Sequence, residues 1–292
     1  MSDSLASLRH KIASAEDLES VVRTMKAIAA SSIGQYETAV RSLDDYYHTV
    51  QMGLAACFQQ DAQSATTSMY QAEARATGVI VFGSDQGLVG QFNELMVAFA
   101  VNTLDKIPGN KIVWAVGERI QSRLEETNLV PREGFVLPNS INAITSLVGQ
   151  ILIEMEAQRE QGAFDQVYLF YNRPQSDSIY TSVSHRLLPL DESWRDKISN
   201  IKWPTKNLPE LVNNREKTLR ALIREYLFVS LFRACAESLA SENASRLAAM
   251  QRAEKNIDEL QGDLNRTFYR LRQNGIDEEL FDVISGFEAL SQ

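Results

Sequence analysis

Apolar side chains recur at steps of three and four residues from Leu5 to Leu54. This spacing places one apolar stripe along a helix, and no proline interrupts the segment. About fifty residues at roughly 1.5 Å rise per residue give a helix on the order of 75 Å long. Its steps depart from a strict heptad, so we expect a gentle supercoil with a partner helix. The stripe consists of Leu5, Leu8, Ile12, Ala15, Leu18, Val22, Met25, Ala29, Ile33, Tyr36, Val40, Leu43, Tyr47, Val50 and Leu54.

A second stripe with the same steps runs from Leu222 to Leu271. The stretch between Pro209 and Gly262 holds neither proline nor glycine, which favours one continuous helix. The two end helices can pair antiparallel only if the chain turns back between them. We therefore predict an antiparallel two-helix coiled coil, formed by residues 1–60 and 208–288, with the middle of the chain inserted as a separate domain.

The middle of the chain alternates short β-branched runs with helical patterns, which is typical of an α/β domain. Continuous apolar runs favour buried parallel strands, and the stretches beginning near Gln91, Gly117 and Ser140 suit crossover helices. The expected strands are 78–82, 111–116, 134–137 and 166–171, with an alternating edge strand within 178–190. We predict a Rossmann-like α/β domain at 75–192, and a link at 191–209 into the last helix.

Composition excludes several classes of protein. With 44% hydrophobic residues the chain is too apolar to be disordered, and a net charge of −9 argues against nucleic acid as a partner. Cys57 and Cys235 lie in apolar stretches, so core thiols are favoured over a disulfide or metal pair. No signal core or membrane-spanning run is present, so we expect a cytoplasmic protein that partners hold at a membrane.

The segment GSDQGLVGQFNE at 83–94 follows an expected strand and opens a helix, where a dinucleotide-binding loop would lie. Its glycines do not match the G-x-G-x-x-G spacing, and no Lys-Ser or Lys-Thr pair follows for a phosphate. Asp85 would repel a pyrophosphate. Nucleotide binding is therefore the minor alternative, and a tight turn whose polar residues face a protein partner is preferred.

No catalytic or metal-binding set emerges from the remaining residues. His10, His48 and His185 lack cysteines or carboxylates at ligand spacing, so we expect no cofactor, no metal and no catalytic residue. Arg9, Lys11, Arg23 and Lys26 give the first helix a mildly basic face, which suits either solubility or an acidic partner.

The last helical stretch ends on apolar side chains, although a free helix end in water should be polar. An apolar tip indicates a sleeve or pocket on a partner. These side chains are Leu280, Phe281, Ile284, Phe287 and Leu290.

Three segments together resemble the γ subunit family of F-type ATP synthases over nearly the whole chain. The opening helix shares the pattern of Ile12, Ser14, Met25, Lys26, Ala29 and Ala30. The central loop shares Ser84, Asp85, Gly87, Leu88, Gly90 and Asn93. The closing segment shares Ala240, Ser241, Glu242, Arg246, Ala249, Met250, Asn256, Arg272, Gln273, Ile276, Glu279 and Gly286. Val89 in place of the family's cysteine and Asp277 in place of a common threonine indicate a divergent branch.

The resemblance implies a non-catalytic central stalk that rotates inside a hexamer of alternating alpha and beta subunits. Its α/β domain, with the epsilon subunit, would grip the membrane c-ring, so the chain would be peripheral on the cytoplasmic face of a bacterial inner membrane. The membrane itself would be reached only through the complex. The implied interface residues are Met25 and Lys26 near the catalytic beta subunits, Arg246, Gln273 and Glu279 on beta loops, and Ser84, Asp85 and Asn93 in the central loop.

Two other classes of function stay open at this point. One is an enzyme for a small molecule or nucleotide, built on the central α/β domain. The other is a coiled-coil scaffold or the stalk of a V-type rotor. The long α/β insert between the helices disfavours the V-type stalk.

Overall fold

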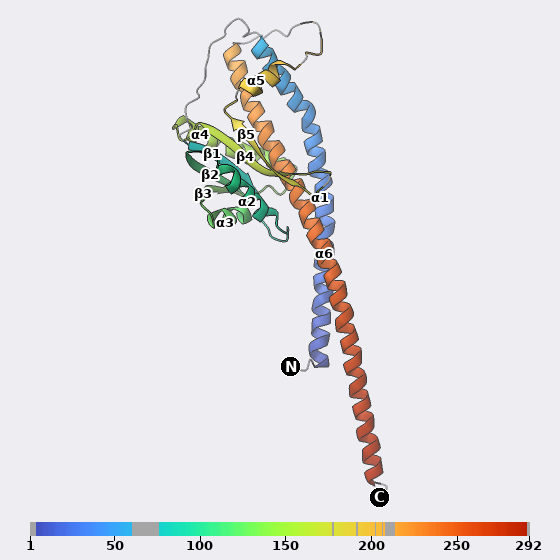
Figure 1. Ribbon diagram of the computed structural model, residues 1–292. Coiled ribbons are helices and arrows are strands. Elements are labelled where there is room, and N and C mark those ends of the chain that lie inside the picture. The colour runs from blue at the N-terminus through green and yellow to red at the C-terminus, as the bar shows by residue number, and fades with distance from the viewer. Residues whose placement is uncertain are drawn as a thin grey trace. The chain divides into compact units, whose positions relative to one another are not determined.

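The computed structural model (Figure 1) describes residues 4–59, 76–176, 178–190, 192–201, 203–205, 207 and 214–290. Its contacts divide the chain into two compact units. The helix-pair unit comprises Met1–Ala29 and Arg246–Gln292, and the sheet unit comprises Ala30–Ser245. Each long helix contributes to both units, so this division differs from the expected ranges 1–60, 75–192 and 208–288, which stay a prediction.

Both expected end helices are present. Helix α1 spans Leu5–Gln59 and helix α6 spans Arg215–Leu290. Helix α6 continues through Gly262, Gly275 and Gly286, where a Cβ would meet nothing within 4 Å. Glycine costs a helix only about 1 kcal/mol relative to alanine, so it weakens these turns without ending the helix. Residues 208–213, where we expected α6 to begin, lie outside the described part of the chain.

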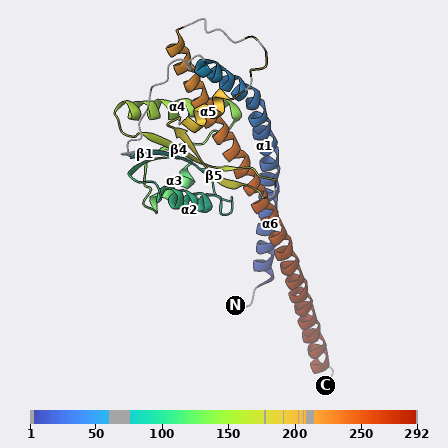
Figure 2. The same ribbon diagram turned by 45° about the horizontal axis from the view of Figure 1, so that its top comes forward.

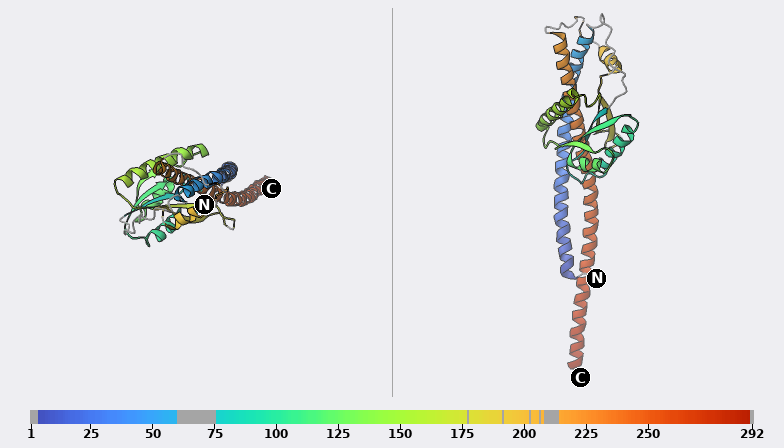
Figure 3. Two further views of the ribbon diagram at one scale, coloured as in Figure 1. Left: turned by 90° about the horizontal axis from the view of Figure 1, so that it is seen from above. Right: turned by 90° about the vertical axis from the view of Figure 1, so that its left-hand side faces the viewer.

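In the helix-pair unit the two helices run antiparallel, side by side (Figures 1 and 3). Three cross-helix contacts show the direction, because the α6 partner moves toward the C-terminus as the α1 residue moves toward the N-terminus. Lys26 pairs with Glu254, Gln261 Nε2 donates to Glu19, and the Arg9 guanidinium lies over the Phe268 ring. The antiparallel pairing that the two stripes predict is confirmed.

The buried side chains of α1 in this unit are spaced seven residues apart: Leu8, Ala15, Val22 and Ala29. The seam is therefore more regular than the steps of the whole stripe indicated. Leu18, which belongs to the predicted stripe, is instead 56% exposed. A regular heptad is the spacing that keeps one seam facing a partner helix.

The sheet unit contains a five-stranded mixed sheet (Figures 1 and 2). Its strands are β1 (Ala76–Phe82), β2 (Asn110–Val116), β3 (Pro131–Phe135), β4 (Gln166–Arg173) and β5 (Thr181–Leu188). The order is β3-β2-β1-β4-β5, with β1 to β4 parallel and β5 antiparallel to β4. This order reproduces the central strands of a Rossmann sheet, as the sequence predicts.

Helices cover both faces of this sheet, as Figure 2 shows. One face packs against α2 (Phe92–Leu104) and α3 (Glu118–Glu125). The other packs against α4 (Ile141–Glu160) and against the parts of α1 and α6 that belong to this unit. The apolar runs of the strands follow from this arrangement, because parallel strands buried on both faces need apolar side chains in both directions.

Two details differ from the sequence prediction. Strand β3 occupies 131–135 instead of 134–137, because it is an edge strand and tolerates Pro131 at its first position. The segment expected as a link contains helix α5 (Glu192–Ser199). Trp194 anchors α5, since its Nε1 donates to the Tyr226 hydroxyl at 2.9 Å and its ring packs edge-on against Phe58.

Within the described residues, no helix combines the length and the apolarity that crossing a membrane requires.

Candidate functional site

The loop at 83–91 joins β1 to α2 at the carboxyl end of the parallel strands, the edge where α/β sheets usually bind ligands. Ser84 and Asn93 lie buried beneath it and bond to each other. The Ser84 amide donates to Asn93 Oδ1 at 3.0 Å, and Asn93 Nδ2 donates to Ser84 Oγ at 2.8 Å. Both predicted interface residues therefore brace the loop from inside, and their side chains are not at its surface.

The Asp85 carboxylate is also used within the fold. Its Oδ1 accepts the Glu118 amide at 3.0 Å, and its Oδ2 accepts the Leu137 amide at 3.1 Å. Because Glu118 opens α3, the Asp85 carboxylate lies at the N-terminus of that helix, where a negative charge is favoured. Asp85 therefore ties the loop to α3 and to the segment that follows β3.

The glycines of this region serve close packing. A Cβ at Gly83 would lie 2.2 Å from the Ile120 Cβ, and one at Gly117 would lie 2.7 Å from the Ser84 carbonyl oxygen. Gly117 also has φ 119°, a left-handed conformation that side chains disfavour. The ends of β1 and β2 can approach α3 and each other only because these positions lack side chains.

The tip of the loop is formed by exposed Gln86, Gly87 and Leu88. Leu88 is 60% exposed and has φ 62°, the one non-glycine residue with positive φ in the described chain. Val89 is buried, and its carbonyl oxygen accepts a 2.6 Å hydrogen bond from Ser245 Oγ on α6. This bond ties the loop to the long helix inside the sheet unit.

Two further residues of α6 bond to the end of β4. They precede Ser245 by one and by two helical turns. Ser241 Oγ donates to the Asn172 carbonyl oxygen at 3.1 Å, and Glu237 Oε2 pairs with Arg173 Nε at 2.9 Å. Glu237, Ser241 and Ser245 therefore form a polar ladder along one face of α6. The sequence analysis did not identify this ladder, although its spacing of four residues was a readable signal.

Glu237 is the charged centre of this ladder and is almost fully buried. Its second oxygen pairs with Arg233 Nε at 2.8 Å, and Arg233 Nη1 reaches Asp44 on α1 at 3.0 Å. Burial raises the pKa of the neighbouring Tyr171 hydroxyl, and the negative charge of Glu237 adds to the increase. The network joins α1, α6 and β4 in the sheet unit.

The other predicted interface residues belong to the helix-pair unit and are described separately. Lys26 Nζ donates to both carboxylate oxygens of Glu254, at 2.8 and 2.6 Å, so its charge is paired across the two helices. Met25 and Arg246 are half-buried, and Gln273 and Glu279 are exposed on α6. The cross-helix role of Lys26 was not apparent from its position on a basic face.

The C-terminal part of α6 presents apolar side chains outward, as the sequence predicts. Phe281 is 68% exposed. The set of exposed residues there is Ile276, Leu280, Phe281, Val283 and Ile284. The side chains of Phe287 and Leu290, which the sequence analysis also assigned to this tip, lie outside the described part of the structure.

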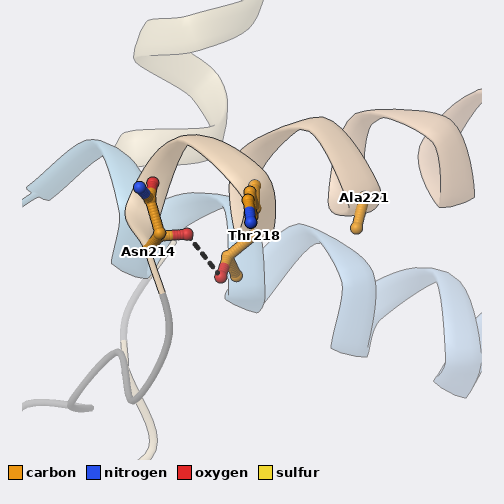
Figure 4. Close-up of a pocket in the computed structure, with 4 residues that line it drawn as sticks. Asn214, Thr218 and Ala221 are labelled. Atoms are coloured by element: carbon orange, nitrogen blue, oxygen red, sulfur yellow. Dashed lines mark hydrogen bonds between the residues drawn. The ribbon is translucent and has the colours of Figure 1, made fainter.

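A shallow open hollow at the start of α6 is lined by Asn214, Lys217, Thr218 and Ala221 (Figure 4). Thr218 Oγ1 donates to the Asn214 carbonyl oxygen at 3.2 Å, and Asn214 Oδ1 caps the first turn by accepting the Glu216 amide at 2.9 Å. One lysine beside three small or neutral side chains does not form a catalytic set. Among the described residues, no three histidine, cysteine or acidic side chains gather as a metal site.

The sequence pattern of one protein family, described as ATP synthase, matches residues 4–290 of the chain. The chain belongs to the ATP synthase family. Two proteins of similar sequence are both named as gamma chains. The "ATP synthase gamma chain" of Polynucleobacter asymbioticus is 25% identical over 289 residues, covering 97% of this chain and 98% of the relative. That of Anaeromyxobacter sp. is 27% identical over 294 residues, covering 98% and 99%.

Solved ATP synthase structures share the fold of this ATP synthase family member. A chain in the cryo-EM structure of the Euglena gracilis mitochondrial ATP synthase, OSCP/F1/c-ring, rotational state 3, is similar with a TM-score of 0.67. It is 16% identical, and the match covers 98% of this chain and 94% of that chain. This likeness shows that long end helices and a mixed α/β sheet also occur together in a chain of a solved ATP synthase structure.

Proposed function

We propose that this chain is the gamma subunit, the central rotor stalk, of an F1Fo ATP synthase. It transmits torque between the ion-driven c-ring and the catalytic alpha/beta hexamer, and it has no catalytic site of its own. The observation that carries this proposal is the antiparallel helix pair whose α6 end presents unpartnered apolar side chains. The full-length likeness to gamma chains supports it.

The mechanism we infer is mechanical. A helix pair has no rotational symmetry matching a ring of subunits, so its turning presents different side chains to each catalytic subunit in succession. Each contact can shift the conformational equilibrium of a subunit only by the difference in its binding free energy between the two states. Ion flow turns the chain at its base, and the changing contacts convert the rotation into changes of nucleotide affinity in the hexamer.

The interface residues fall into two groups under this proposal. Met25, Lys26, Arg246, Gln273 and Glu279 of the helix-pair unit face the beta subunits. Because Lys26 is paired with Glu254, its contribution is to fix the register of the two helices near that surface.

The central loop forms the second interface. Ser84, Asp85 and Asn93 contribute by holding the loop in shape, since their polar groups are bonded within the fold. The surface that a partner meets is the tip they support.

The partners that follow are the alpha and beta subunits, the epsilon subunit and the c-ring. Nucleic acid is not among them, in line with the net charge of −9. We place the chain at the cytoplasmic face of a bacterial inner membrane, as a peripheral protein that reaches the membrane through the complex.

The direct experiment is purification of the tagged full-length chain from membranes, followed by identification of the proteins that accompany it. We expect alpha, beta, epsilon and c subunits in fixed ratio, together with ATP-driven ion pumping by the complex. A Glu279→Lys variant tests the beta-facing role, because reversing an exposed charge should lower pumping per ATP hydrolysed while the chain still folds. Recovery of the chain without alpha and beta subunits would contradict the proposal.

A calorimetric titration addresses the alternative of an enzyme built on the sheet unit. Titration of the isolated chain with ATP and with NAD should give only heats of dilution. Binding of either nucleotide at micromolar affinity would favour the enzyme.

A further inference from the structure

Helix α6 presents a smooth surface where it lies beside the end of β4. Its buried side chains there are mostly small, and small side chains interlock little with a neighbouring element. Apolar burial is non-directional, so it holds α6 against the sheet without fixing how the helix is turned about its own axis. The small buried residues of this stretch are Ala234, Cys235, Ala236, Ser238, Ala240 and Ser241.

Directional bonds supply what this smooth packing lacks. Glu237, Ser241 and Ser245 lie at successive turns on one face of α6, and they bond to the end of β4 and to the loop after β1. A hydrogen bond weakens steeply as its angle departs from a straight line. A turn of α6 about its axis would therefore strain the three bonds together.

Glu237 makes the strongest of these attachments. Its side chain is 6% exposed, and its two oxygens bond to Arg173 Nε at 2.9 Å and to Arg233 Nε at 2.8 Å. Arg173 is itself oriented by its own strand, because its Nη2 donates to the Tyr171 hydroxyl and its guanidinium lies over the Tyr171 ring. The pair of Glu237 with Arg173 thus joins two oriented groups, and bonds between charged groups are stronger than neutral ones.

Stability alone does not account for a carboxylate at this position. Removing a charge from water costs free energy that its ion pairs return only in part, and an apolar side chain in such a place often leaves a protein equally stable. An ion pair adds one preferred arrangement, because a displaced α6 would leave the Glu237 charge buried and without its partner on β4. The feature that this charge favours is the position of α6 on the sheet.

That position matters for the transmission of torque. Under the proposed function the sheet unit receives torque from the c-ring, and the helix pair delivers it to the catalytic hexamer. Helix α6 is continuous from one unit into the other, since Ser245 and Arg246 are consecutive residues on the two sides of the division. Torque that enters the sheet must therefore pass to the long helices inside the sheet unit.

We propose that Glu237 is a positioning residue for torque transmission. With Arg173 it fixes α6 in one rotational register on the sheet, so that the helix turns together with the sheet when the rotor works against an opposing ion gradient. This inference rests on the proposed function, and it concerns a link within the sheet unit.

The test measures ATP-driven ion pumping by the assembled complex in membrane vesicles, without an ion gradient and against an imposed one. Glu237→Gln removes the charge at nearly constant shape, and Arg173→Gln breaks the same pair from the other side. Without a gradient the torque is small, so both variants should pump as many ions per ATP as the wild type. Against the gradient this ratio should fall by about twofold or more, because losing a bond between charged groups changes the ratio of two registers by about fivefold or more.

Two sets of controls separate register from stability. Asp44→Asn removes the exposed outer contact of Arg233 on α1 and should keep the wild-type ratio under both conditions. Ile144→Val and Ile144→Ala, on the buried face of α4, should lower the thermal unfolding midpoint by less and by more than Glu237→Gln does. Both should also keep the wild-type ratio of ions pumped per ATP.

Three results would overturn the inference. The first is an unchanged ratio against the gradient in either Glu237→Gln or Arg173→Gln, since the pair needs both partners. The second is a loss no greater than that of the Ile144 variants, because reduced stability would then explain it. The third is an equal loss in Asp44→Asn. Failure of the wild-type chain to enter a complex that pumps ions would instead count against the proposed function, so the two failures are distinguishable.

Discussion

In the sheet unit α1 and α6 pack on a β-sheet as well as on each other, whereas in the helix-pair unit they pack on each other alone. The sheet unit has two large apolar clusters, one on each face of the sheet. The helix-pair unit has a seam of one buried α1 residue in seven, with Leu18, Val21 and Ile28 exposed beside it. One pair of helices thus serves as part of a core in one region and as a presented surface in the other.

This difference shows where stability and contact with partners are located. A sheet covered on both faces holds its shape without a partner, because its apolar surface is already buried. A two-helix seam leaves apolar side chains in water, and such side chains indicate a partner surface. Substitutions in the two units should therefore affect different measurements.

The largest expected effect on stability comes from Phe82→Ala in the sheet unit. Phe82 is fully buried at the end of β1, and removing its ring leaves a cavity that should lower the free energy of unfolding by about 3–5 kcal/mol. Denaturant unfolding of the full chain measures this. Ile153→Ala, on the exposed face of α4, is the matched control and should change stability by less than about 0.5 kcal/mol. Equal effects would contradict a core at this position.

Glu237→Gln should have the next largest effect. The change removes a buried charge that bonds to Arg173 and Arg233, but both guanidinium groups are partly exposed and can regain water. We expect a loss of about 1–2 kcal/mol in unfolding free energy, toward the low end for bonds to charged groups. Glu216→Gln, in an exposed pair with Arg220 on the same helix, should be close to neutral. A neutral Glu237→Gln would mean that the ladder does not stabilise the sheet unit.

Lys26→Glu should have a smaller and local effect. It places two carboxylates opposite each other at Glu254, which should destabilise the helix pair by about 1 kcal/mol and speed amide exchange in residues 5–29. The double variant Lys26→Glu with Glu254→Lys restores opposite charges and should recover most of the protection. If the double variant exchanges as fast as the single one, the ion pair does not hold the helices together.

Phe281→Ser should have the smallest effect on stability and a clear effect on function. Phe281 is 68% exposed, so unfolding free energy should change by less than about 0.5 kcal/mol. Under the proposed function, the assembled complex should pump fewer ions per ATP, since the tip loses an apolar contact. Unchanged pumping would remove Phe281 from the interface.

Much of the fold could be predicted because its signals are periodic. The apolar steps of three and four identified α1 and α6, and the β-branched runs identified β1, β2 and β4. Strand β3 was displaced because its edge position permits the exposed residues Arg132 and Glu133, which weaken the apolar signal. Helix α5 was missed, since eight residues with one proline-rich flank resemble a link.

The sequence indicated which residues belong to the candidate site, but it did not indicate the contacts that these residues make. The sequence identified the loop and Leu88 as part of a motif, but it could not indicate the positive φ, which depends on the contacts of Ser84, Asp85 and Val89. The bond from Ser245 to Val89 and the pair of Lys26 with Glu254 join residues more than 150 positions apart. Such contacts depend on helix register, which a stripe of apolar residues does not fix.

The most direct test of the central claim is to observe rotation of the chain within an immobilised alpha/beta hexamer during ATP hydrolysis. Cys57 and Cys235 are fully buried, so a cysteine introduced at the exposed Ile153 would carry the only accessible probe among the described residues. Our account predicts ATP-dependent rotation of the probe in one direction, which stops when ATP is exhausted. ATP hydrolysis by the complex with a stationary or randomly moving probe would contradict it.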